Sequence, residues 1–312
     1  MHTDETGWTP DPVTKENLAV MRRRAERMTD AEIAELSFLA DGAAEYSLGL
    51  LRDGMDLYEV LSLIADEVPL SDAESGEGRK GARAAWHRAY DRAVFADLYL
   101  EKLALHGLSP GESDFLPQGE TPETFTYVKN AYADEAYEVF SAEFRDPRVR
   151  YSHTFSEAAK SVLDGECGYC LLPLAEKGGV RLSSVTDLLA KNDLKIASVT
   201  PVFGFSGDAE LWYALVSRTF RVPPVRREDD RYLEIRCSEE SDGTLSDLLT
   251  AARVFGATLY RIHTVTRRSI GEDGVYYTVV FRTEGKSFTD LLTYLTLYTE
   301  TYVPVGLYRN LE

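Results

Sequence analysis

A chain of 312 residues, of which 44% are apolar, is long enough to bury a substantial core and to form two or three domains. Its net charge of -18 argues against nucleic-acid binding, because affinity for nucleic acid comes mainly from cations that neutralise phosphates. No window approaches the eighteen or so consecutive apolar residues of a membrane span, and residues 1–12 lack the apolar region of a secretion signal. We therefore expect a cytoplasmic protein with neither a nucleic-acid nor a membrane partner.

The first third of the chain is predicted to be helical. Apolar residues recur at helical spacing between Ile33 and Leu48, directly after Thr29-Asp30-Ala31-Glu32, a capping box that begins a helix. The stretch Ser71–Gly81 is rich in Gly, Ser and Glu and predicts a loop. The four expected helices are Lys15–Met28, Thr29 to about Asp53, Met55–Val68 and about Arg83–Leu105.

The middle of the chain alternates short apolar runs with helical stretches. It lies between a linker at Ser109–Thr121 and a second linker made of Pro223, Pro224 and the charged run Arg226–Arg231. Strands are expected at Phe125–Val128, Val149–Tyr151, Tyr169–Leu174, Leu194–Val202 and Tyr213–Val216, with helices at Asp134–Phe144, Phe155–Asp164 and Val185–Asn192. Such alternation predicts a largely parallel α/β sheet.

Cysteines and histidines give little sign of redox or metal chemistry. Cys167 and Cys170 form a C-x-x-C, but they open an apolar segment, and no helix follows directly to lower a thiolate pKa. A buried strand is therefore favoured over a redox centre. The five histidines never sit at metal-ligand spacing, so we expect no metal and no cofactor.

The last region carries six predicted elements in the order βαββαβ, which is the split βαβ plan. They are strand Tyr232–Cys237, helix Leu245–Val254, strands Thr258–Thr266 and Val275–Thr283, helix Ser287–Thr299 and strand Val303–Tyr308. A Gly-Glu-Asp-Gly turn signature separates the two central strands.

This order, with Asp242-Gly243-Thr244-Leu245 before the first helix and Val305-Gly306-Leu307-Tyr308 at the end, resembles an ACT domain. The closest resemblance is to the ACT domain of prephenate dehydratases, in which a Gly-Ala-Leu turn and a Glu-Ser-Arg-Pro segment frame an inhibitory phenylalanine at a dimer interface. The resemblance implies a homodimer that binds a small-molecule effector, an aromatic amino acid, at Asp242, Gly243, Thr244, Leu245, His263 and Thr264.

A physical argument also favours a ligand at this turn. A glycine before a helix start lets backbone N–H groups face a carboxylate at the positive end of the helix dipole. The alternative is that Gly243 only turns the chain while Ser241 or Thr244 caps the helix.

The middle region is similar to prephenate dehydratases over most of Phe125–Phe203. Ala158–Leu174, which includes Leu172-Pro173-Leu174, is similar to the stretch of that family that ends in Pro-Ile-Glu-Asn-Ser. Where the family has Gly-Pro-x-Gly-Thr-Phe, Glu-Asn-Ser and Thr-Arg-Phe, this chain has Lys129–Ala133, Ala175–Lys177 and Leu211–Tyr213. The family's second lobe is inserted where this chain has only the short stretch between Phe203 and Trp212.

The N-terminal helices resemble the all-helical type of chorismate mutase. Leu18-x-x-Met21-Arg22 fits that family's first helix, and Glu59 matches the acidic residue of its second. The resemblance implies that Arg22 binds a carboxylate, and the alternative is a solvated arginine in a basic turn. Two further arginines of the family fall at Leu39 and Tyr58.

The expected fold class is multidomain α + α/β + α+β. Residues 1–118 are predicted to be a helical, chorismate-mutase-like domain, residues 119–228 a truncated, single-lobe dehydratase-like α/β domain, and residues 229–312 an ACT domain. The leading hypothesis is a degenerate chorismate mutase/prephenate dehydratase relative that senses a metabolite and regulates aromatic amino acid metabolism. The alternatives are an active enzyme, with Arg22, Arg52, Arg83, His87, Arg88 and Arg92 around a helical chorismate pocket, and a purely structural oligomer that binds nothing.

Overall fold

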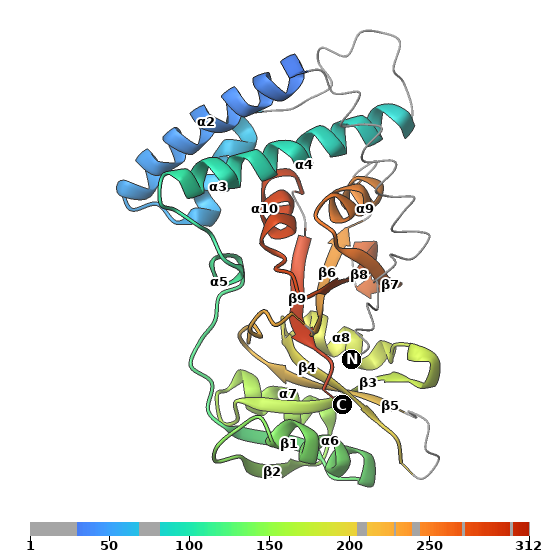
Figure 1. The fold of residues 1–312 in the computed structure, drawn as a ribbon. Helices are drawn as coiled ribbons and strands as arrows, with labels where there is room; N and C mark the ends of the chain where they lie inside the picture. Colours follow the sequence, from blue (N-terminus) through green and yellow to red (C-terminus); the bar gives the residue numbers. More distant parts are fainter. Residues whose placement is uncertain are drawn as a thin grey trace, which may run out of the picture.

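The computed structural model describes residues 30–68, 82–204, 211–227, 229–238, 244–269, 272–299 and 302–311. The predicted helix Lys15–Met28 and the loop Ser71–Gly81 lie outside these residues. Three layers are visible in Figure 1: helices at the top, a C-terminal sheet with its own helices below them, and an α/β region at the bottom.

The N-terminal region contains the three long helices that its apolar periodicity predicts. Helix α3 begins at the cap Asp56, whose side chain accepts a hydrogen bond from the backbone N–H of Glu59 at 2.9 Å. The helices of this region are α2 (Asp30–Arg52), α3 (Leu57–Glu67) and α4 (Ala82–Leu105), followed by the short helix α5 (Glu112–Phe115).

The middle region alternates strands and helices as expected, with one strand reversed. Its elements are β1 (Thr124–Val128), α6 (Ala131–Ser141), β2 (Arg148–Ser152), α7 (Phe155–Leu163), β3 (Tyr169–Glu176), α8 (Ser183–Lys191), β4 (Lys195–Val202) and β5 (Leu211–Ser217). Strand β1 pairs in parallel with β2 and β3, but β5 lies antiparallel between β3 and β4. Only residues 203–210 join β4 to β5, and so short a connection without a crossover helix joins antiparallel neighbours.

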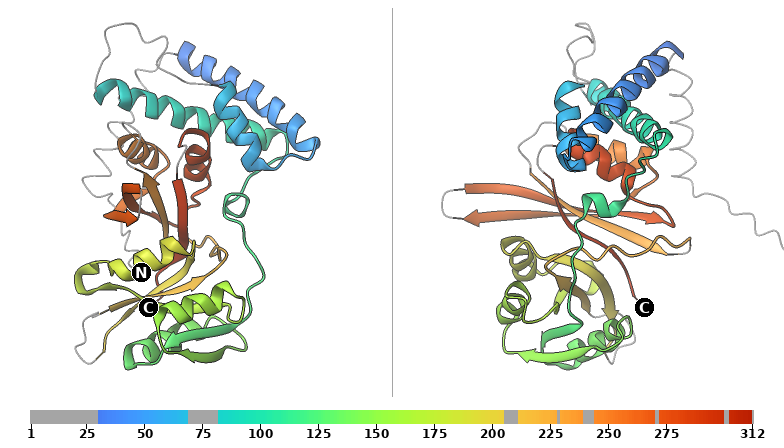
Figure 2. Two further views of the ribbon diagram at one scale, coloured as in Figure 1. Left: turned by 180° about the vertical axis from the view of Figure 1, so that it is seen from behind. Right: turned by 90° about the vertical axis from the view of Figure 1, so that its left-hand side faces the viewer.

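The C-terminal region has the predicted βαββαβ order. Its elements are β6 (Asp230–Ser238), α9 (Thr244–Val254), β7 (Thr258–Ser269), β8 (Glu272–Glu284), α10 (Thr289–Tyr298) and β9 (Tyr302–Arg309). The strands lie in the order β9-β6-β8-β7, and the long β7–β8 hairpin projects to one side of the molecule (Figure 2).

The α/β and C-terminal regions share one nine-stranded sheet, because β4 pairs in parallel with β9. This junction, which we call the seam, has a single register pair, Ile196 with Gly306. A Cβ atom at Gly306 would lie 2.6 Å from the carbonyl oxygen of Ile196, so only glycine allows the two strands to approach this closely.

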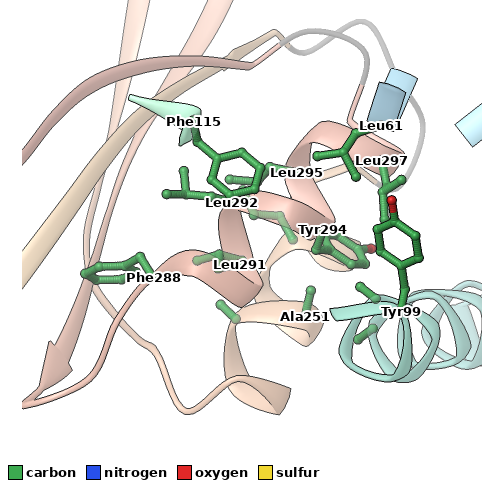
Figure 3. Close-up of a cluster of buried hydrophobic side chains, with 14 of the residues drawn as sticks. Leu61, Tyr99, Phe115, Ala251, Phe288, Leu291, Leu292, Tyr294, Leu295 and Leu297 are labelled. Atoms are coloured by element: carbon green, nitrogen blue, oxygen red, sulfur yellow. The ribbon is translucent and has the colours of Figure 1, made fainter. Parts of the chain in front are cut away.

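The N-terminal helices and the C-terminal region are built around one hydrophobic core. Leu61 of α3 and Tyr99 of α4 face Tyr294 and Leu297 of α10 in Figure 3. The hydroxyl group of buried Tyr99 is satisfied by Ser47 of α2 at 2.7 Å. Two smaller cores fill the opposite faces of the α/β sheet. The helical region is thus packed against helices α9 and α10 rather than standing apart from them.

Two linker predictions were wrong in part. Ser109–Thr121 contains α5, in which Glu112 is buried, and Arg231 of the charged run Arg226–Arg231 is fully buried in β6. The two side chains form a bidentate ion pair, with Nη1–Oε1 and Nη2–Oε2 distances of 2.7 and 2.6 Å. Arg231 can therefore be buried at the end of a charged run, because its charge is neutralised by a partner 119 residues away.

The part of the chain that the structure describes holds no helix that is both long and apolar enough to cross a membrane.

Candidate functional site

The predicted chorismate-site residues are not brought together within the described residues. Arg22 lies outside them, and Glu59 is exposed in the first turn of α3. Arg52 is exposed, and the guanidinium of Arg92 lies 5.0 Å from the ring centre of Tyr298 in α10. The side chains of Arg83, His87 and Arg88 also fall outside the described residues.

The predicted effector residues are divided between two faces of the C-terminal sheet. Asp242 and Gly243 lie outside the described residues, as does the side chain of Thr244, the first residue of α9; Leu245 packs partly buried against the core shared with the N-terminal helices. Thr264 is paired with Tyr277, which packs against this same core. His263 is the neighbour of Thr264 in the strand and is paired with Thr278, so it points to the other face.

On that other face, at the seam, three polar side chains form a buried cluster. Glu234 stands in the middle of β6, where Tyr308 of β9 donates a hydrogen bond to its Oε2 at 2.9 Å. Arg181, which precedes α8, donates from Nη2 to the same oxygen, and the two side chains of this ion pair are only 11% and 4% exposed. Burial would lower the pKa of Arg181, but the charge of Glu234 outweighs it and the pKa is raised.

A turn with two glycines places Arg181 and Arg261 side by side. Lys177–Gly179 reverses the chain after β3, so that Arg181 forms a bridge with Ala175. Gly179 has a φ of +79°, and its carbonyl oxygen accepts a hydrogen bond from Nη1 of Arg261 at 2.9 Å. A side chain at Gly179 would collide with the Arg261 guanidinium, so the glycine leaves the space that this arginine occupies.

His263 lies beside the cluster, and its surroundings favour the neutral imidazole. Burial lowers the pKa of His263, and the positive charges of Arg181 and Arg261 lower it further, while Glu234 raises it. Its Nε2 atom is buried and makes no hydrogen bond in the structure. The cluster and its immediate surroundings therefore hold two arginine cations and one carboxylate.

A pocket opens next to this cluster, and its empty volume, including the open mouth, is about 400 Å³. Arg181 and Arg261 line it together with Trp212 of β5. Its aromatic wall also includes three tyrosines, Tyr232, Tyr260 and Tyr308, with ring-centre distances of 4.9 Å from Tyr232 to Tyr260 and 5.8 Å from Tyr232 to Tyr308.

None of the cluster residues was singled out from the sequence, except His263. Glu234 interrupts the apolar strand Tyr232–Cys237, and a carboxylate at the centre of a buried strand signals a partner. The partners could not be read from the sequence, because Arg181 and Tyr308 come from elements 53 and 74 residues away.

The positions that resemble dehydratase catalytic segments serve packing and capping here. The Asn130 side chain caps α6 by accepting from the backbone N–H of Ala133 at 3.0 Å. Tyr213 is buried in the core beside α6, where burial raises the pKa of its phenol. Ala175, which stands where the family has glutamate, is buried and has no acidic group.

The C-x-x-C is buried as predicted. Cys167 and Cys170 are free thiols in the core of the α/β region, and burial raises the pKa of both. Thiols with raised pKa values are poor nucleophiles at neutral pH, which supports the buried-strand interpretation. Among the described residues, no group of three or more His, Cys, Asp and Glu side chains is placed to hold a metal ion.

No protein-family model matches the chain, and no curated protein matches it. Among solved structures, the chain is similar to a prephenate dehydratase from Streptococcus mutans, at 12% identity and a TM-score of 0.47, over 60% of this chain and 98% of that one. It is similar to GqqA, described as a novel type of quorum quenching acylase, at 16% identity and a TM-score of 0.45, over 61% of this chain and 96% of that one. A prephenate dehydratase from Arthrobacter aurescens in complex with L-Phe matches at 14% identity and a TM-score of 0.43, over 59% and 89%.

Proposed function

We propose that this protein is a regulatory relative of the fused chorismate mutase and prephenate dehydratase, in which an ACT-like C-terminal region senses an aromatic amino acid or similar metabolite. The protein acts as a homodimer in aromatic amino acid metabolism. The effector binds at residues 242–245, where the N-terminus of α9 offers backbone N–H groups to a carboxylate.

One observation carries this proposal: helix α9 is packed between the N-terminal helices and the C-terminal sheet. Helix α4 lies across α9 within the shared core, and the sheet below α9 continues through β9 into the α/β region. A ligand at the start of α9 would therefore stabilise the packing of α9 on both the N-terminal helices and the C-terminal sheet. An element that two regions contact is a physical route by which ligand binding at one can affect the other.

The loss of catalytic groups supports a regulatory function over a catalytic one. Prephenate carries two carboxylates, and a site for it needs cations or N–H donors that converge with water excluded. The segments that resemble the family's catalytic motifs hold a helix cap at Asn130, a buried tyrosine at Tyr213 and a buried alanine at Ala175.

A thermal-shift screen tests the proposal with phenylalanine, tyrosine, tryptophan, chorismate and prephenate. A ligand at a hundredfold excess over its Kd stabilises the native state by about 2.7 kcal/mol, which raises the melting temperature by several degrees. The shift should vanish in Gly243→Val and persist in Gly42→Val, since a side chain at Gly42 would meet only open space.

Two results would overturn it. One is the absence of any shift at millimolar concentration, which favours a purely structural oligomer. The other is turnover of prephenate by the purified protein that a point mutation within residues 125–219 abolishes, which establishes an active enzyme.

A further inference from the structure

Among the described residues, the wall of the seam pocket has cationic side chains and no anionic one. The charged side chains that line it are Arg181 and Arg261, and no carboxylate is among its lining residues within the described chain. Glu234, the nearest acid of the cluster, lies beneath the pocket and already accepts hydrogen bonds from Arg181 and Tyr308. Arg261 has a neutral partner, the carbonyl oxygen of Gly179.

The shape and chemistry of the walls define the other half of a ligand. Tyr232 and Tyr308 are opposite one another on β6 and β9, and their rings stack with an interplanar angle of 16°. Tyr260 meets Tyr232 edge-on, and Trp212 adds an indole from β5. Walls of this kind favour a flat apolar group, because aromatic rings gain from stacked and edge-to-face contacts.

We propose that the seam pocket is a binding site for a small organic anion with one carboxylate and a flat, apolar body. The carboxylate pairs with the guanidinium of Arg261, whose planar fork matches carboxylate geometry, and the flat group lies among the rings of Tyr232, Tyr260 and Trp212. This site lies on the face of the sheet opposite α9, so it is separate from the turn at 242–245 and does not depend on it.

Such a ligand contacts two regions of the chain at once. Arg181 and Trp212 belong to the α/β region, whereas Tyr232, Arg261 and Tyr308 belong to the C-terminal region. The two regions are joined in the sheet by the register pair of Ile196 with Gly306 and by a bridge between Val199 and Asn310. An anion held by both sides adds contacts between the two regions, so its occupancy strengthens the seam.

Tryptophan fluorescence tests the site, with 3-phenylpropanoate as the probe and 3-phenylpropanamide as its uncharged analogue. Of the three tryptophans in the chain, Trp212 lines the pocket. The acid should change the emission in a saturable way, and the amide should bind at least tenfold more weakly, because it lacks the charge that pairs with Arg261. The emission change should disappear in Trp212→Phe while the acid still raises the melting temperature.

Variants of two arginines locate the binding. Arg261→Gln should weaken the affinity for the acid tenfold or more, whereas Arg145→Gln, which removes an exposed arginine of the α/β region, should leave it within twofold. Arg261→Lys keeps the charge but loses the planar fork, so its affinity should fall between wild type and Arg261→Gln. Melting temperatures without ligand show whether each variant is folded.

Two outcomes contradict the proposal: equal affinity of wild type and Arg261→Gln, and no response of the wild-type protein at millimolar 3-phenylpropanoate. Gly243→Val separates this site from the effector site of the proposed function. It should abolish the response to the amino-acid effector and leave the response to 3-phenylpropanoate unchanged.

Discussion

Two buried arginine–glutamate pairs join distant segments of this chain, and they differ in whether a second arginine lies beside the pair. Arg231 is fully buried and donates to both oxygens of Glu112 and to the carbonyl oxygens of Pro223 and Lys286. Glu112 in turn accepts from the backbone N–H of Phe288 at 2.7 Å. At the seam, Arg181 and Glu234 are also paired, whereas Arg261 beside them has a carbonyl oxygen as its hydrogen-bond partner and, among the described residues, no carboxylate.

The difference separates a structural pair from a candidate binding site. Burying a charge is costly unless it is paired and hydrogen-bonded, and the Glu112–Arg231 pair meets this requirement within the protein. At the seam, Arg181 is the arginine that has a carboxylate partner among the described residues. Arg261 at the pocket wall is therefore the cation that an external anion could pair with.

The largest effect is expected from breaking the buried Glu112–Arg231 pair. Arg231→Met leaves Glu112 buried without its cation, and we expect a loss of about 3–5 kcal/mol in the free energy of unfolding, measured by urea denaturation. Glu112→Gln/Arg231→Met removes both charges and keeps an acceptor for Phe288, so it should recover a large part of that loss. If Arg231→Met lost less than about 1 kcal/mol, the pair would not be desolvated as it is in the structure.

Substitutions at two neighbouring glycines, Gly178 and Gly179, test how the turn holds Arg261 at the seam. Gly178 and Gly179 have φ angles of +80° and +79°, so alanine at either position costs about 1–2 kcal/mol of backbone strain. A Cβ at Gly178 meets open space, whereas one at Gly179 collides with Arg261. The colliding atoms are the end of a flexible side chain that can move, so the added cost is mainly the lost hydrogen bond from Arg261 to the Gly179 carbonyl. Gly179→Ala should therefore lose about 0.5–1.5 kcal/mol more than Gly178→Ala in the same denaturation experiment.

Binding of 3-phenylpropanoate gives this comparison a second measurement. Gly179→Ala displaces Arg261 and should weaken the binding, whereas Gly178→Ala should not. Equal behaviour of the two variants would show that Arg261 is not held by the turn.

The sequence predicted local structure better than it predicted the site. Helix starts and the βαββαβ order depend on neighbouring residues: α2 begins at Asp30, next to the predicted start, and the βαββαβ order is confirmed. The predicted cap Thr29 lies outside the described residues. The reversal of β5 also has a local cause, the short connection from β4, which was recognised as short but not as a reversal.

Long-range pairing could not be read in this way. Arg231 was assigned to a charged linker because its neighbours are charged, and its partner Glu112 lay in another segment assigned as a linker. His263 and Thr264 were assigned to one site, although adjacent strand residues point to opposite faces. A register argument from the alternation in β7 would have separated them.

The smallest predicted effect is the pH dependence that His263 adds to stability. Its folded pKa lies below the ordinary value of 6.5, first because of burial and then because of Arg181 and Arg261. Between these two pKa values the unfolded chain binds a proton that the folded protein does not, so the stability falls as the pH drops below about 6.5. The slope is at most about 1.4 kcal/mol per pH unit and smaller here, because the ring is only partly buried.

The His263→Gln variant isolates this contribution. Carboxylates and the other histidines titrate alike in both proteins, so the difference between the two stability curves, measured from pH 7.5 to 5 by urea denaturation, reports His263. We expect the variant to lose less stability than wild type over that range. Parallel curves would show that His263 is not desolvated beside the arginines. A ligand carboxylate at Arg261 would offset positive charge near His263, so saturating 3-phenylpropanoate should also reduce the wild-type slope while leaving the slope of the variant unchanged.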